Sequence, residues 1–373
     1  MKKSIFIIGV LFVVFLSVFS AKADTYDDFL SESRSNEVFD SLPDDAKSAL
    51  NDIGIDGFDY KSLENIKPDK VMENILNAIS VQGKTPLRVF LTVISVMLLY
   101  SILYGLKNSL DGALQPVISL GVTLCITCVL VLPLTEFITS TVNVITTSSD
   151  FMLAYVPLMV LALGLSGQPI SGAGYYSVMI FTGQAVGNIA SKIVAPFLKI
   201  FLALGISSSI SPNINLSGMI RFISKLTKII LAFSVSIFTG VLSFKQVISM
   251  GADTLSSRAV RFSISSFVPI VGSALSEAYR TVQGSVGLLK SGIGIVSVVA
   301  LLAVYLPVIV QALFWMLTLA LAKAVGEVLN LREPCVLLES VYTVISTLFS
   351  IILCMIMIFI ISSSAVVILG GFG

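Results

Sequence analysis

The sequence contains no histidine among its 373 residues. This absence excludes catalytic dyads and triads built on imidazole, and every zinc site that needs a histidine ligand. Charged residues are also scarce, at 12% of the chain, whereas hydrophobic residues make up 55%. A soluble domain would carry about twice that share of charge, so the composition indicates a polytopic membrane protein. We therefore expect a lipid bilayer around the chain, which the net charge of +1 does not contradict, and we expect no nucleic-acid partner.

Cysteine and acidic residues are too few and too scattered to predict a reactive site. The four cysteines form no disulfide framework, and the C-I-T-C of Cys125 and Cys128 lies in an apolar run, where free cysteine is an ordinary buried residue. Only eight acidic residues follow Pro86, mostly near expected helix ends. We therefore expect no enzyme activity, no catalytic residues, no metal and no cofactor.

Residues 1–23 have the pattern of a cleavable signal peptide. Two lysines precede the apolar run Ile5–Phe19, and Ala21-Lys22-Ala23 places small residues at positions −3 and −1 of a cleavage site. An uncleaved membrane anchor is the alternative. In either case, the chain that follows begins outside the cytoplasm.

Residues 24–85 form a short polar segment with 14 acidic and 6 basic residues. Pro68 opens a predicted helix whose apolar stripe begins at Val71. The segment is too small for a large core of its own. We expect a helical extracytoplasmic cap that docks on the membrane domain or on a partner.

Residues 86–373 form a membrane domain, and the predicted fold class is all-α. A span needs about 20 apolar residues, and the sequence indicates about eight transmembrane helices, with amphipathic or re-entrant helices besides. The predicted spans are Leu87–Leu106, Leu114–Leu134, Phe151–Ser166, Gly174–Gly187, Ile193–Ile210, Ile229–Phe244, Ser291–Ala322 and Val341–Ile361. Thr135–Asp150 has acids but no base, which favours a loop outside the cytoplasm.

Several spans have unusual features. Phe151–Ser166 and Gly174–Gly187 are short, and they fit either two thin spans or one re-entrant hairpin. Gly183 and Gly187 form a G-x-x-x-G motif, which favours close helix packing. Pro307 is expected to break or kink the uncharged run Ser291–Ala322, as in the interrupted helices of channels and transporters.

A central block, residues 244–294, interleaves charge, glycine and apolar residues. Helical spacing places Lys245, Ser249, Asp253 and Ser257 on one face, away from an apolar face. Such helices lie at a membrane interface or line a wet cavity. The block carries five bases and two acids, although counting spans places it outside the cytoplasm, where basic loops are disfavoured. Either one short span does not cross the membrane, or the block folds back into the membrane with paired charges; we favour the second interpretation.

The central block resembles the stage III sporulation protein AE family of endospore-forming bacteria. The resemblance is carried by short runs and single residues of the block: Gly251-Ala252-Asp253, Arg258, Arg261-Phe262, Phe267-Val268-Pro269-Ile270-Val271-Gly272, Thr281-Val282, Leu288-Leu289-Lys290, Gly292 and Gly294. The order of signal peptide, polar segment and spans is also similar, so the resemblance covers nearly the whole chain.

The resemblance implies a multi-pass protein in the mother-cell-derived membrane around the forespore. Its partners would be other membrane proteins of the same sporulation operon and a forespore membrane protein. Together they would form a channel-like or secretion-like complex that supports late forespore gene expression. A self-sufficient secondary transporter or permease for a small solute is the alternative, although the spans show no internal repeat.

The candidate structural or channel-lining residues are Asp253, Arg258, Arg261, Pro269, Gly272, Arg280 and Lys199. A charge in or near lipid is costly unless it is paired or reaches water. We expect the partner of Asp253 on another helix, with Arg280 or Lys199 as candidates. The alternative is that these charges face solvent on an interfacial helix; for Lys199, the alternative is an amine that reaches the interface.

Overall fold

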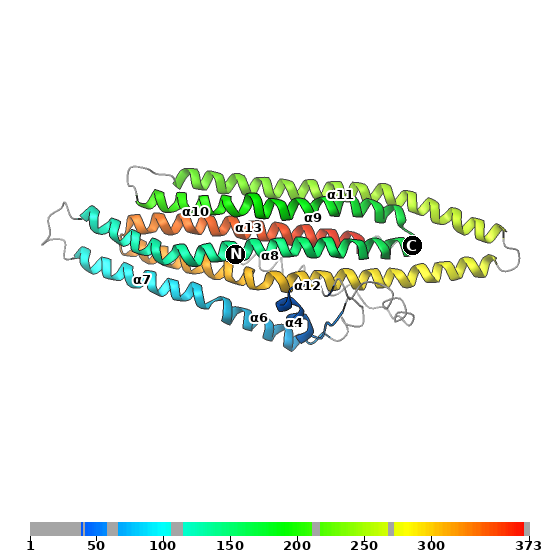
Figure 1. The fold of residues 1–373 in the computed structure, drawn as a ribbon, viewed down its shortest axis with the longest axis horizontal. Coiled ribbons are helices and arrows are strands. Elements are labelled where there is room, and N and C mark those ends of the chain that lie inside the picture. Colours follow the sequence, from blue (N-terminus) through cyan, green and yellow to red (C-terminus); the bar gives the residue numbers. More distant parts are fainter. Residues whose placement is uncertain are drawn as a thin grey trace.

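The computed structural model is helical throughout the part of the chain that it describes. The described residues are 39, 42–57, 66–105, 115–210, 217–267 and 272–368. The helices are α4 (Asp44–Asp52), α6 (Pro68–Gln82), α7 (Lys84–Gly105), α8 (Gln115–Leu165), α9 (Pro169–Ile189), α10 (Ala195–Ile210), α11 (Ser217–Phe267), α12 (Gly272–Val328) and α13 (Arg332–Ile368). The long helices lie side by side in an elongated bundle (Figure 1). The all-α prediction is confirmed for these ranges, and the predicted signal peptide lies outside them.

Six helices of the described ranges are long and apolar enough to cross a membrane, where the sequence indicated about eight spans. They are Pro68–Ile102, Leu120–Leu165, Pro169–Leu204, Gly218–Val260, Ser291–Val328 and Arg332–Val367. The shortest has 35 residues and the longest 46. Each therefore exceeds the roughly 20 residues that a bilayer requires. The count differs from the prediction because segments interpreted as loops are helical.

The predicted loop Thr135–Asp150 is the clearest correction, because it forms the middle of α8. Its many hydroxyl side chains donate to carbonyl oxygens four residues earlier in their own helix. Thr139 donates to Thr135 at 2.9 Å and Thr141 to Phe137 at 2.8 Å. These bonds satisfy the hydroxyls without breaking the helix, so a polar composition did not indicate a loop here.

Neither the two thin spans nor the re-entrant hairpin is observed after this point. A short turn at 166–168 reverses the chain, and α9 continues through a π-helical turn, Ala190–Val194, into α10. A Cβ atom at Gly183 would lie 2.9 Å from Cδ2 of Leu153 on α8. The G-x-x-x-G motif is therefore a close-packing site between α8 and α9, as predicted.

Pro307 does not interrupt its helix, so of the two predicted effects, a break or a kink, the break is wrong. α12 runs from Gly272 to Val328 with Pro307 inside it. A proline removes one backbone hydrogen bond, and packing against neighbouring helices can hold such a helix together. α12 packs most extensively on α13 and also on α8.

The core of the bundle lies around α12 and α13. In the most apolar window of each helix, 61% of α12 and 56% of α13 is buried, against 6% of α11. Trp315 and Tyr305 of α12 are among the largest fully buried side chains. α11 therefore packs on the outside of the bundle.

Two helices of the predicted polar segment contact α12, and one of them, α6, falls within the membrane-length helix Pro68–Ile102. Pro68 is the first residue of α6, as predicted, and both α4 and α6 contact α12. Leu50 and Ile55 are completely buried, which anchors the α4 region. α6 itself buries no residue completely, and Met72 and Leu76 on its apolar stripe stay exposed.

Candidate functional site

Asp253 of α11 is buried against the start of α9, and only 3% of its surface is exposed. Its two carboxylate oxygens accept hydrogen bonds from two successive backbone N–H groups. Ile170 donates to Oδ1 at 2.9 Å and Ser171 to Oδ2 at 2.7 Å. The carboxylate thus joins two helices that are distant in sequence.

The local sequence of α9 explains why its first turn needs such a partner. The first N–H groups of a helix have no partner within the helix, and a side chain at the cap position usually accepts from them. Gln168 occupies that position and makes no capping hydrogen bond from its side chain. Pro169 follows and has no N–H, so the donors are Ile170 and Ser171. Asp253 supplies the missing acceptor from another helix, and its negative charge lies at the positive end of the α9 dipole.

The residues on either side of Asp253, four positions away, complete the junction. Ser257 donates to the carbonyl oxygen of Gly167 at 3.3 Å, in the turn between α8 and α9. Gly167 has a φ of 80°, a conformation that suits glycine. On the other side, Ser249 Oγ lies 3.1 Å from where a Cβ atom of Gly174 would be. The predicted polar face is therefore the contact face of α11 with α9, except for Lys245, which is exposed.

Lys199, one of the two expected basic partners of Asp253, does not lie near it. Lys199 is exposed and lies far along the α9–α10 run, about 43 Å from Ile170 at 1.5 Å per residue. The predicted pairing of Asp253 with Lys199 is therefore wrong. Among the described residues, the hydrogen-bond donors to the Asp253 carboxylate are backbone amides. The solvated alternative is also wrong for Asp253, although Arg258 is exposed, as that alternative expects.

The remaining predicted residues are only partly described. Arg261 belongs to α11, whereas Gly272 and Arg280 belong to α12. Only their backbone positions are described, and Pro269 lies outside the described residues. A pairing of Asp253 with Arg280 therefore remains a prediction.

A second polar cluster lies toward the other end of α11 and was not predicted as a unit. Glu339 of α13 accepts from Arg221 of α11 at 3.1 Å and from Lys323 of α12 at 3.2 Å. Lys323 also lies 3.5 Å from Glu327, the pair that the spacing of four residues predicts. Because its members come from three helices, the cluster holds these helices in fixed relative positions. The contact with Glu339 depends on how the helices pack, so the sequence alone did not predict it.

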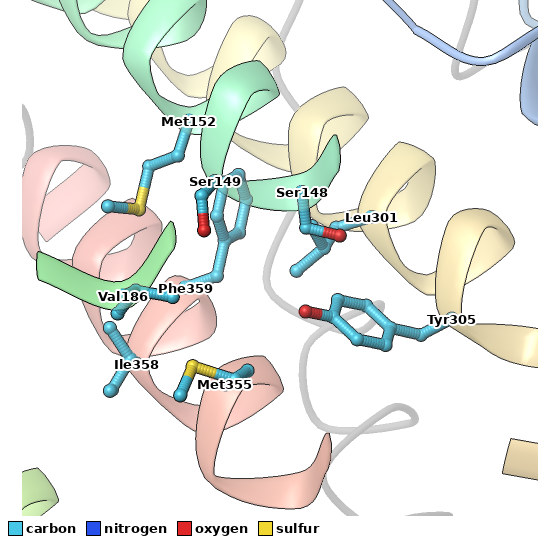
Figure 2. A pocket seen from close by; sticks show the side chains of 9 residues that line it. All are labelled: Ser148, Ser149, Met152, Val186, Leu301, Tyr305, Met355, Ile358 and Phe359. Carbon is cyan, nitrogen blue, oxygen red and sulfur yellow. The ribbon is translucent and has the colours of Figure 1, made fainter. Parts of the chain in front are cut away.

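The bundle interior contains a small pocket with few polar groups (Figure 2). Its lining residues come from four helices: Ser148, Ser149, Met152, Val186, Leu301, Tyr305, Met355, Ile358 and Phe359. The Tyr305 hydroxyl points toward Ser148, whose own hydroxyl donates to Val144. The hydroxyls of Ser148 and Ser149 donate to carbonyl oxygens of their own helix, and the lining offers no charged group for acid–base chemistry.

Two further buried hydroxyl contacts join the helices near this pocket. Tyr155 lies 3.3 Å from Ser363, which donates to the carbonyl of Gly294 at 2.8 Å. Tyr175 lies 3.0 Å from Ser362. Each contact pairs α13 with another helix, so these polar groups satisfy one another inside the core.

The polar groups of Asp253 are engaged within the fold, because its oxygens already accept two amide hydrogen bonds. Within the described ranges, no group of three or more Cys, Asp or Glu side chains is placed to hold a metal ion. The junction of α11 with α9 therefore acts as a structural joint that positions the outer helix.

Comparison with known proteins identifies a family. A family model described as stage III sporulation protein AE matches residues 59–370. The protein named "Stage III sporulation protein AE" of Bacillus subtilis (strain 168) is 28% identical over 160 residues, which are 43% of this chain. That match covers 40% of the relative's length. No solved structure matches the chain.

Proposed function

Because the chain belongs to the stage III sporulation protein AE family, we propose that it is a membrane subunit of a complex that links mother cell and forespore during endospore formation. The complex would be channel-like or secretion-like and would support late forespore gene expression. The chain would lie in the mother-cell-derived membrane around the forespore. It would have no enzymatic activity of its own.

The observation that carries this proposal is the family match over a chain whose described residues include six membrane-length helices. The match includes all six helices and the central block from which the resemblance was predicted. The proposed partners are other membrane proteins of the same sporulation operon and a forespore membrane protein.

The packing of the bundle favours a subunit over a self-sufficient transporter. The two central helices are largely buried, and the pocket between α8, α9, α12 and α13 is small and mostly apolar. Two features that suggested a transporter have another explanation, because Pro307 lies within a continuous α12 and the short spans belong to long helices. The third, Lys199, is an exposed base of α10. A path for solutes would then require surfaces of partner chains.

Deletion of the gene tests the proposal. We expect vegetative growth to be unchanged and spore development to stop after engulfment, with loss of late forespore reporter expression. A plasmid copy of the full-length gene should restore both readouts. A normal yield of heat-resistant spores in the deletion strain would overturn the proposed function.

A further inference from the structure

The outward side of α11 is an uncovered apolar surface. Only 6% of its most apolar window is buried, the lowest share among the six membrane-length helices. Toward the end of the helix, exposed apolar residues lie three, four or seven positions apart. They are Val241, Phe244, Ile248, Leu255 and Phe262. These side chains are 47% to 71% exposed. We call them, together with Gly251 and Arg258 between them, the α11 stripe.

Lipid alone cannot cover so long an apolar face. The membrane-length part of α11, Gly218–Val260, has 43 residues and is about 65 Å long at 1.5 Å per residue. A bilayer is about 30 Å thick in its hydrocarbon and about 40–45 Å with its headgroups. Even a tilt of 40°, the upper end for membrane helices, leaves roughly 50 Å along the membrane normal. Exposed apolar side chains occur near both ends, at Phe222 and Phe262, so part of this face lies outside the bilayer.

The spacing of the α11 stripe fits a partner helix. Residues 241, 244, 248, 251, 255, 258 and 262 follow alternating steps of three and four over three heptads. This repeat keeps one seam facing a second helix along its whole length. Gly251 lies in the seam, and nothing occupies the space within 4 Å of where its Cβ atom would be. A partner backbone can approach closely there.

The charges of α11 determine which partner fits. The helix carries six basic residues and a single acid, Asp253, which is buried and bonded to α9. Arg258 lies in the stripe itself, and Lys245 and Lys225 are also exposed. A second copy packed on the same face would bring bases against bases, which is unfavourable.

We propose that the α11 stripe binds an apolar helix of a different membrane protein, whose seam carries Asp or Glu where it meets Arg258 and Lys245. Such a helix would cover the stripe, and its acids would pair with bases that have no acid available on α11. The proposal rests on the proposed function only in that it assigns a surface to one of the expected membrane partners.

Site-specific photocrosslinking in the full-length protein tests this surface. A photoreactive amino acid replaces Ile248 or Leu255 in sporulating cells, and Ser256, exposed but outside the stripe, is the matched control. We expect adducts at positions 248 and 255, at least tenfold above those at 256, with one other membrane protein. The crosslinked peptide should be an apolar helix that contains Asp or Glu. Adducts with lipid only, with a second copy or within the same chain would overturn the proposal.

A charge reversal tests the electrostatic part. Arg258→Glu should lower the crosslinking yield from position 255 about tenfold, whereas Lys192→Glu, an exposed base on another helix, should leave it unchanged. If Arg258→Glu reduces the amount of protein, a second measurement is used: the crosslinking yield from position 255 in membranes that keep Arg258, at increasing salt concentration. This yield should fall as salt rises. A crosslinking yield that changes neither with Arg258→Glu nor with salt would overturn the proposal that the partner helix is acidic.

These results separate the two proposals. Normal sporulation of the deletion strain together with the expected adducts would refute the proposed function alone. Blocked sporulation without the adducts would refute the α11 surface alone.

Discussion

The carboxylate of Asp253 lies 2.7 Å from the backbone nitrogen of Ser171, so a residue of α11 caps a helix that begins more than 80 positions earlier in the chain. The contact replaces a local cap that Gln168 does not provide. It also fixes the outer helix α11, which has few buried side chains of its own. The position of the α11 stripe therefore depends on this buried hydrogen-bonded joint.

Substitution of Asp253 should separate the loss of charge from the loss of the acceptor. Asp253→Ala leaves two buried amides without a partner, and we expect a loss of about 3 kcal/mol in stability. Asp253→Asn keeps one acceptor oxygen but turns an NH2 donor toward the second amide, so we expect a loss of about 2 kcal/mol, smaller than for Asp253→Ala. Protein level in membranes and thermal unfolding in detergent measure both.

If a basic residue were the partner of Asp253, Asp253→Asn would instead leave that base unpaired and cost about as much as Asp253→Ala. The matched control is Asp150→Ala, which removes an exposed carboxylate from α8 and should have little effect. Equal losses for Asp253→Asn and Asp253→Ala would contradict the capping role and favour a charged partner.

Gly294 should be intolerant of even one added methyl group. Its Cβ atom would lie 2.7 Å from Cγ2 of Val367 on α13, a β-branched side chain with little freedom to move. We expect Gly294→Ala to cost about 1–3 kcal/mol by overpacking. Gly121→Ala in α8 is the control, since its Cβ site is open and alanine favours the helix there by roughly 0.5–1 kcal/mol. Comparable melting temperatures for the two variants would argue against close packing at Gly294.

Glu339→Gln should weaken the three-helix polar cluster moderately. Glu339 is 39% exposed, so losing its contacts with Arg221 and Lys323 should cost about 1 kcal/mol or less. Glu327→Gln removes only the longer contact with Lys323 and should cost less. Because salt screens exposed pairs, the difference between wild type and Glu339→Gln should shrink from low to 1 M salt. A difference independent of salt would show that charge pairing is not the cause.

Thr139→Pro distinguishes a helix from a loop in the middle of α8. Thr139 is exposed, so its replacement disturbs little packing, but proline inside a helix costs about 3 kcal/mol or more. We expect a large drop in the amount of folded protein in membranes. Thr139→Ala is the control and should behave like wild type. α8 already contains Pro133 and Pro157, so normal accumulation of Thr139→Pro would contradict the expected cost of a proline at this position.

The sequence predicted the class of fold well because apolar composition and helical spacing are local properties. The start of α6 at Pro68 and the packing role of Gly183 followed from such local signals. The helix lengths could not be predicted in this way. The composition of residues 135–150 resembles that of a loop, but their hydroxyl groups donate to carbonyl oxygens of their own helix.

The candidate site was predicted in part. Helical spacing correctly grouped Ser249, Asp253 and Ser257 on one face, but it could not show which surface that face meets. The one local signal was at α9, where Gln168 and Pro169 leave the first amides without a cap. The uncapped amides of α9 and their acceptor Asp253 are more than 80 residues apart in the sequence. Neither segment alone shows that the two come into contact.

The continuous α8 also determines where a reporter can be placed to measure orientation in the membrane. An enzyme tag inserted between Thr135 and Asp150 would divide a helix at the buried residues Phe137 and Thr141, and its signal would describe a damaged protein. Asn330, which has a φ of 57°, lies in the turn between α12 and α13, so a tag inserted there would interrupt no helix. A tag there should report the side of the membrane on which the Glu339 cluster lies.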